Sequence, residues 1–135
     1  MITRNQQDRQ KALSLMRMAE ITLKRLNESD KQKYPSNTLT DYYDIIHKLM
    51  EALAANEGIK VKGEGAHQQL IDHTCERYKL GEQTRQFLQQ LREYRNRVSY
   101  EGFIVRPEFI ETNSEKIETT VNRLTKLLQE GTKRK

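Results

Sequence analysis

Apolar side chains recur at three- and four-residue steps along most of the chain, which is the period of an amphipathic helix. The longest series forms a seam of nearly three heptads after Pro107, with the members Ile110, Ser114, Ile117, Val121, Leu124 and Leu128. A second series follows Pro35 and consists of Leu39, Tyr42, Tyr43, Ile46, Leu49, Met50 and Leu53. No segment alternates between apolar and polar residues as a strand would, so we expect helices and no strands.

Glycine and proline divide this pattern into segments. Gly58, Gly81 and Gly102 follow apolar series as helix-ending residues do, and Pro107 suits a first helical position. Thr38 with Asp41 resembles a capping box. The expected helices are residues 3–27, 38–57, 66–80, 82–100 and 107–130. They predict an all-α fold, an up-and-down helical bundle of four main helices plus one short helix, in one domain spanning residues 1–135.

The first of these helices has one broad apolar face and two apolar residues outside it. We expect the face to be buried, with the members Ala12, Leu13, Met16, Ala19, Leu23 and Leu26. Met18 and Ile21 fall outside this face, either as scattered surface residues or as contacts for a partner.

The segment GIKVKGEG, residues 58–65, holds three glycines and two lysines. This composition raises the possibility of a phosphate-cradling loop. However, the segment has neither GK[ST] nor GxGxxG, and no predicted strand precedes it. We therefore expect a flexible connector.

Composition excludes several classes of protein. The formal charge of +5 comes from 24 Lys and Arg against 19 Asp and Glu, which permits a nucleic-acid partner without requiring one. Cys75 is the single cysteine, so neither an intrachain disulfide nor a cysteine-based zinc site is expected, and no histidine lies at a triad spacing from it. No apolar run is long enough to span a membrane. We expect a cytoplasmic protein with no cofactor and no metal, whose basic GTKRK end is a solvated helix terminus.

The segment LREYRNRVSYEGF, residues 91–103, carries the most informative charged side chain. Arg95 falls inside the apolar arc of its helix, where a cation is costly unless something pairs with it. One reading is structural: an ion pair with Asp44 or Glu93, or a dimer contact. The other is an anion site, because a guanidinium matches phosphate in a bidentate way. Asn96 and Tyr100 occupy an adjoining face.

These residues also resemble those of the HEPN domain family (higher eukaryotes and prokaryotes nucleotide-binding). Its signature is an Arg, a polar residue and a His about four to six residues after the Arg. Arg95 and Asn96 match the first two positions, and Tyr100 stands where the His would fall. The segments DYYDIIHKLMEAL, residues 41–53, and GEGAHQQLIDH, residues 63–73, resemble the second helix of the family and its loop with the short helix that follows.

The resemblance implies an all-helical homodimer that acts on RNA. Many HEPN proteins are metal-independent ribonucleases, often toxins of toxin–antitoxin systems, in which two motifs face one cleft. By the family pattern, Arg95 would bind the scissile phosphate and Asn96 would orient it. Tyr100 stands in the place of the catalytic His. Other members pair with a nucleotidyltransferase-type antitoxin or only bind. Our expected site is therefore Arg95, Asn96 and Tyr100, in a ribonuclease or in a non-cleaving binding subunit; a plain helical scaffold is the third reading.

Tyrosine is a poor resting base at neutral pH, since its reference pKa is about 10. The histidines His47, His67 and His73 all precede Arg95, so none fills the motif by spacing. His67 could approach from the third helix, although a histidine near a helix start is more often structural. We expect His47 to be packed, and we expect Tyr42 and Tyr43 to lie in the core rather than to stack on bases.

Overall fold

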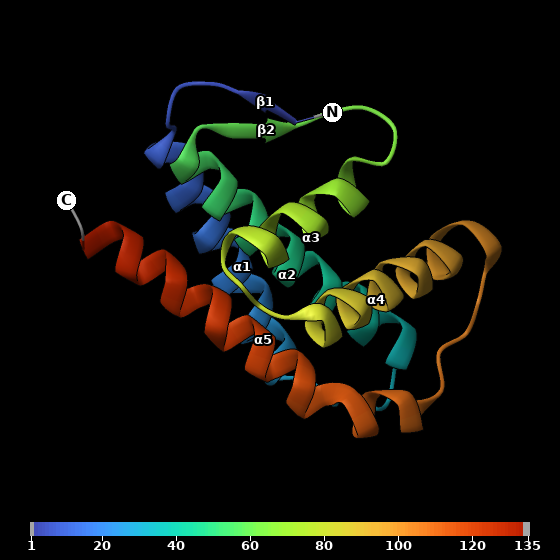
Figure 1. The fold of residues 1–135 in the computed structure, drawn as a ribbon. Coiled ribbons are helices and arrows are strands. Elements are labelled where there is room, and N and C mark those ends of the chain that lie inside the picture. The colour runs from blue at the N-terminus through green and yellow to red at the C-terminus, as the bar shows by residue number, and fades with distance from the viewer. Residues whose placement is uncertain (1, 134–135) are drawn as a thin grey trace.

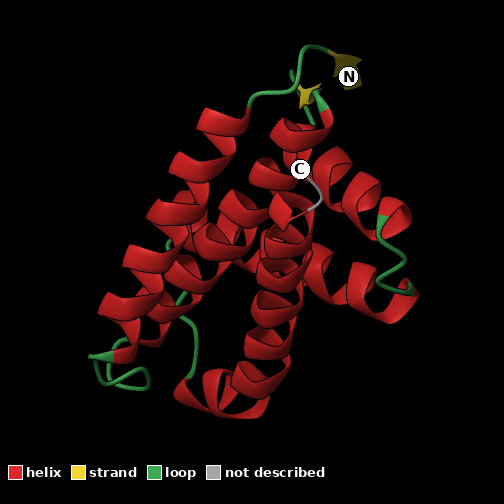
Figure 2. Cartoon of the chain, turned by 90° about the vertical axis from the view of Figure 1, so that its left-hand side faces the viewer, coloured by secondary structure: helices red, strands yellow, loops and turns green. Residues whose placement is uncertain are grey.

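The computed structural model describes residues 2–133, with side chains described through Gly131. Five helices dominate it: α1 (Arg9–Asn27), α2 (Pro35–Glu57), α3 (Ala66–Arg77), α4 (Glu82–Glu101) and α5 (Pro107–Lys133). Two short strands, β1 (Ile2–Arg4) and β2 (Ile59–Val61), pair at one end of the helices (Figures 1 and 2). Within this range no helix combines the length and the hydropathy that crossing a membrane requires.

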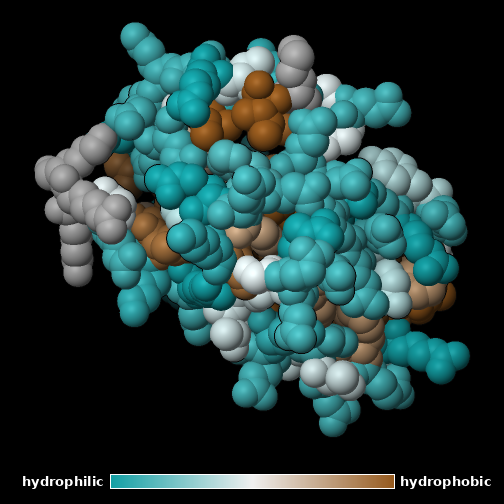
Figure 3. All heavy atoms as spheres, viewed as in Figure 1, coloured by the Kyte–Doolittle hydropathy of each residue, from teal (hydrophilic) through white to brown (hydrophobic). Residues whose placement is uncertain are grey.

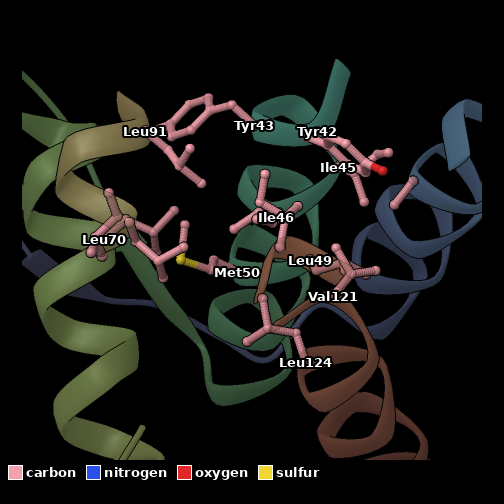
Figure 4. Packing of buried hydrophobic residues seen from close by; sticks show 14 of the residues in the cluster. Tyr42, Tyr43, Ile45, Ile46, Leu49, Met50, Leu70, Leu91, Val121 and Leu124 are labelled. Atoms are coloured by element: carbon pink, nitrogen blue, oxygen red, sulfur yellow. The ribbon is translucent and has the colours of Figure 1, made fainter. Parts of the chain in front are cut away.

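Helix α2 is the centre of the fold, because it packs against each of the other four helices. Its side chains Ile46, Leu49 and Met50 lie between α3 and α4 on one side and α1 and α5 on the other (Figure 4). All three are at most 1% exposed. A helix that is apolar around most of its circumference must be covered on most sides, which explains why this segment takes the central position.

The seam of α5 is buried as its spacing predicts. Five of its six members are at most 3% exposed: Ile110, Ile117, Val121, Leu124 and Leu128. The helix packs against α2 within the same chain. The seam is therefore used inside the protomer and does not face a second copy.

The sequence prediction of no strands is wrong at the N-terminus and in the predicted connector. β1 and β2 form an antiparallel pair, with Ile2 opposite Val61 and Arg4 opposite Ile59. Helix α1 consequently begins at Arg9 rather than near residue 3, and the Asp8 side chain caps it by accepting from the backbone N–H of Lys11 at 2.9 Å. Strands of three residues are too short to show alternation in a sequence.

Three other helix ends differ from the prediction by three residues. α2 begins at Pro35, since proline suits the first helical turn, and the hydroxyl of Thr38 donates to the carbonyl of Lys31 at 2.6 Å instead of forming a capping box. α3 ends at Arg77, three residues early, because Lys79 turns the chain with a φ of 53°. α5 continues past residue 130 to Lys133.

Helix α1 buries less of its apolar face than predicted. Ala12, Ala19 and Leu26 are buried, but Leu13 is 53% exposed. Met18 and Ile21 are exposed, as their positions on the helix predict. Leu13 lies on the wall of a large cavity between α1 and α5, which is described below.

Gly58 allows the N-terminal segment to approach the end of α2. It caps α2 with a left-handed φ of 74°, and its carbonyl accepts from the backbone N–H of Asn5. A Cβ atom at this position would collide with the carbonyl oxygen of Asn5 and lie 3.2 Å from the backbone nitrogen of Gln7. Only glycine tolerates both the backbone angle and this close approach.

We expect Gly58→Ala to lower the free energy of unfolding by about 2 kcal/mol or more, from the left-handed backbone and from the collision with Asn5. Gly65→Ala is the matched control, because Gly65 has a φ of 76° and a Cβ atom there would meet nothing within 4 Å. Urea unfolding measures both losses, and hydrogen exchange at residues 2–8 reports whether that segment detaches. Equal losses in the two variants would contradict the role given to the close approach.

Candidate functional site

Arg95 is half-buried on α4 and lacks the ion pair that a structural role predicts. Its Nε atom is buried and has no hydrogen-bond partner among the described residues. Neither Asp44 nor Glu93 pairs with it there; Glu93 instead lies 3.9 Å from the guanidinium of Arg92. A buried donor without a partner costs about 1–3 kcal/mol. Arg95 therefore carries unused hydrogen-bonding capacity.

The other two predicted site residues point away from Arg95 within one chain. α4 remains helical through Glu101, so Tyr100 lies about 140° around the helix from Arg95. Tyr100 is 79% exposed, and Asn96 is half-buried. One protomer thus does not gather Arg95, Asn96 and Tyr100 around one point. The groups that Arg95 does influence electrostatically are Tyr43 and His67.

Four side chains from α2 and α3 form what we call the histidine cluster: Tyr43, His47, Glu51 and His67. The Tyr43 hydroxyl oxygen lies 3.0 Å from Nδ1 of His67. The rings of His47 and His67 stack with centroids 3.9 Å apart and planes 10° apart. Nε2 of His47 lies 3.2 Å from Oε1 of Glu51, one helical turn along α2. The cluster is continuous from the buried core to the surface.

The surroundings of the cluster keep its central groups neutral. Partial burial of the His67 ring lowers its pKa, and the positive charges of His47, when protonated, and Arg95 add to this effect. Burial raises the pKa of Tyr43 to about 12, although Arg92 and Arg95 oppose that shift. The hydrogen bond from His47 lowers the pKa of Glu51. At neutral pH the cluster therefore holds a neutral His67, a protonated phenol and an ionised carboxylate.

A neutral imidazole at the surface can accept a proton. His67 remains exposed as a residue even though its Nδ1 atom contacts Tyr43. If Nδ1 carries the ring hydrogen and donates it to the Tyr43 oxygen, Nε2 keeps its lone pair for a substrate. A positive charge on the His47 ring, stacked 3.9 Å away, disfavours protonation of His67.

A pocket of about 290 Å³ opens beside the histidine cluster. His47, Glu51 and His67 line one part of it, and Lys11 and Lys60 line another. The N-terminal segment that Gly58 holds in place lines a further part, and apolar residues of α2, β2 and α3 complete the wall. The segment of residues 58–65, which we expected to be a flexible connector, thus contains strand β2 and contributes Lys60 to this pocket.

Arrangements for other chemistry are absent from the described part of the chain. No group of three or more His, Cys, Asp or Glu side chains there is placed to hold a metal ion. The stacked rings of His47 and His67 lie in nearly parallel planes, so their nitrogen lone pairs do not converge on one point. Burial raises the pKa of Cys75 to about 11, which keeps its thiol protonated.

The sequence interpretation considered His67 but missed its contacts. Tyr43, His47 and Glu51 follow one another at four-residue steps on α2, which places them on one stripe of the helix. This spacing is the sequence signal that could have identified the three residues. It places a tyrosine, a histidine and a glutamate in a row on one face of the helix. Their meeting with α3 depends on tertiary packing. Tyr42 and Tyr43 are buried, as predicted.

Comparisons of the chain with protein-family models, with curated proteins and with solved structures give no match.

Proposed function

We propose that this chain is an RNA-directed, HEPN-like protein that uses Arg95 to hold a phosphate and His67 to move a proton. One observation carries the proposal: a half-buried guanidinium without a partner lies within electrostatic range of a neutral, surface-accessible imidazole. Arginine suits phosphate oxygens, and imidazole suits proton transfer near neutral pH. His67 thus takes the role that the tyrosine at position 100 fills poorly.

The proposed reaction is a metal-independent transesterification of RNA. His67 accepts the proton of the ribose 2′-hydroxyl at Nε2, while the 2′-oxygen forms a bond to phosphorus. The bond from phosphorus to the 5′-oxygen breaks, and the proton held by His67 passes to that oxygen. The products are a 2′,3′-cyclic phosphate and a 5′-hydroxyl. Arg95 stabilises the charge on the phosphoryl oxygens.

Tyr43 and His47 support this step as positioning residues. Tyr43 fixes the tautomer and orientation of the His67 ring through the 3.0 Å contact at Nδ1. His47 packs against the face of that ring, and Glu51 holds His47 in turn. Lys11 and Lys60 add positive charge to the adjacent pocket, which suits the RNA backbone.

The quaternary part of the proposal concerns the outer face of α4. We propose an up-and-down bundle of the HEPN type that forms a homodimer in which Asn96 and Tyr100 line a cleft between the two copies. The exposure of Tyr100 leaves its phenol available to RNA or to the second protomer. A toxin activity would follow from cleavage of cellular RNA.

We expect purified protein to cleave a single-stranded RNA oligonucleotide in the presence of EDTA and to leave the 2′-deoxy version of the same oligonucleotide intact. The deoxy substrate lacks the attacking hydroxyl and is the matched control. Mass spectrometry of the products identifies the cyclic phosphate. Tyr100→Phe is measured beside the wild type, and a loss of more than about tenfold would give the phenol a part in the chemistry. Cleavage of the deoxy substrate would contradict the mechanism.

A second candidate function is a non-catalytic HEPN-like subunit that binds a nucleotidyltransferase-type antitoxin or another protein. Tyr100 and Ile104, near the end of α4, are 79% and 78% exposed, which favours a protein contact at this place. A folded protein that leaves RNA intact would favour this candidate. In that case Arg95 would be a contact for the partner.

A further inference from the structure

The largest cavity among those described shares only Ile59 with the pocket beside the histidine cluster. It has a volume of about 640 Å³, within the range of small-molecule sites. Its walls come from the N-terminal segment, the start of α1, the end of α5, the ends of α2 and α3, and strand β2. In Figure 1 the start of α1 and the end of α5 both lie on the left of the molecule. There Figure 3 has hydrophobic atoms reaching the surface among hydrophilic ones.

Apolar side chains form the body of this cavity. They come from three helices and are Ala12, Leu13, Met16, Leu53, Leu127 and Leu128. Leu13 is 53% exposed although it lies on the apolar face of α1. α1 and α5 each pack against α2, and the space between their ends remains open to solvent. The cavity therefore offers apolar contact to a ligand.

Positive charge surrounds this apolar body. Arg4 from β1, Arg9 from α1 and Arg77 from α3 line the cavity, against the two acids Glu57 and Glu130. The guanidinium groups of Arg4 and Arg9 form no hydrogen bond or ion pair with the described residues. The Asp8 carboxylate already caps the N-terminus of α1, so the attraction for an anion comes from the arginine side chains rather than from the helix end.

The acid at the back of the cavity is already engaged. Glu57 accepts a hydrogen bond from the Tyr78 hydroxyl, and its other oxygen lies 3.3 Å from Nε2 of His73 and 3.9 Å from Nε of Arg77. Its side chain is only 14% exposed. This network offsets the charge of Glu57, so the free arginines at the rim determine which ligand the cavity favours.

We propose that this cavity binds a small amphipathic carboxylate, with its carboxylate at Arg4 and Arg9 and its apolar body against Leu13 and Met16. The shape and the charge together select such a ligand, because an arginine binds a carboxylate in a bidentate way and an alkyl or aromatic body covers the exposed apolar wall. The proposal does not depend on the RNA-directed function, since the cavity shares no residue with Arg95 or with the partners of His67.

The test is isothermal titration calorimetry with octanoate on the full chain. Acetate, which has the charge without the body, and 1-octanol, which has the body without the charge, are the ligand controls. We expect octanoate to bind saturably at one site, and acetate and octanol to bind at least about tenfold more weakly. Absence of saturable octanoate binding, or equal binding of octanol, would overturn the proposal.

Variants on α1 locate the site. Arg9→Gln is expected to weaken octanoate binding by about tenfold or more, because it removes a charged hydrogen-bond donor. Arg17→Gln changes the charge equally on the same helix outside the cavity and should leave binding unchanged. Leu13→Ser should weaken binding, whereas Met18→Ser, which is equally exposed outside the cavity, should not. Equal effects within either pair would place binding elsewhere. Each of these residues is exposed, so folding is preserved.

Discussion

Arg95→Met is expected to lower RNA cleavage in EDTA by about 100-fold or more and, in the same protein, to raise the free energy of unfolding by about 1 kcal/mol. The loss follows from removing the group that stabilises the phosphoryl oxygens. The gain follows because methionine keeps the apolar stem of the side chain and removes a buried Nε without a partner. A variant that is more stable but less active indicates that the original residue is retained for its chemical role rather than for stability.

Arg97→Met is the matched control for this variant. It lies two residues away on α4, changes the net charge equally and is exposed, with its guanidinium 4.2 Å from the Phe103 ring centroid. We expect it to change cleavage by less than about threefold. Chemical denaturation and RNA binding at several salt concentrations complete the measurement, and the salt slope should fall by about one for Arg95→Met. A destabilised Arg95→Met would instead restore the structural reading of Arg95.

The helical content of the chain could be predicted because it depends on local information. The seam of α5 repeats at steps that place Ile110, Ile117 and Val121 on one face, and that face is buried. The same reasoning placed Arg95 within the apolar arc of α4, where it is half-buried. A sequence pattern thus predicts which face of a helix turns inward. It does not specify the partner of each side chain.

The missed features depend on contacts between distant parts of the chain. β1 pairs with β2 across more than fifty residues, and each strand is too short for its own pattern to be recognised. The exposure of Leu13 reflects the gap between α1 and α5, which no helix sequence contains by itself. The predicted ion pairs of Arg95 failed for the same reason, since rotamers and packing decide which carboxylate a guanidinium reaches.

In the candidate site, too, one residue could be predicted from local sequence and the others depend on tertiary contacts. Arg95 could be found from its helix, but His67 gains a role only when α3 brings it to Tyr43 and His47. Tyr100 joined the expected site only through the resemblance to the HEPN motif, which is read along the sequence. In space, five residues of helix separate the side chains of Arg95 and Tyr100 by about 140°. The titratable groups that the charge of Arg95 influences, Tyr43 and His67, come from other helices.

His67→Asn is expected to lower RNA cleavage by about 100-fold or more while leaving RNA affinity within about threefold of the wild type. The variant removes the proton acceptor and keeps Arg95, so catalysis is lost and binding is not. His73→Gln is the control, because His73 contacts Glu57 beside the other cavity. A comparable loss of cleavage in His73→Gln would contradict the assignment of His67.

The pH dependence gives His67 a second readout that does not require cleavage. Because the pKa of His67 is lowered in the folded protein, the unfolded chain binds its proton first as pH falls. Stability should therefore be full above the unfolded value of about 6.5 and be lost as pH falls through the lowered folded value. The wild-type cleavage rate should fall over the same acid range, since a protonated His67 cannot accept the 2′-hydroxyl proton.

In His67→Asn this part of the pH dependence should disappear. The lowered pKa of Glu51 causes a separate loss of stability at lower pH, below its ordinary value of 4.5, because protonation breaks its contact with His47. Urea unfolding between pH 3 and 8 therefore separates the two groups by the range in which each acts. If the free energy of unfolding of His67→Asn depended on pH above 5 as that of the wild type does, the pKa of His67 would not be lowered by folding. That result would contradict the assignment of His67 as the base in the proposed proton transfer.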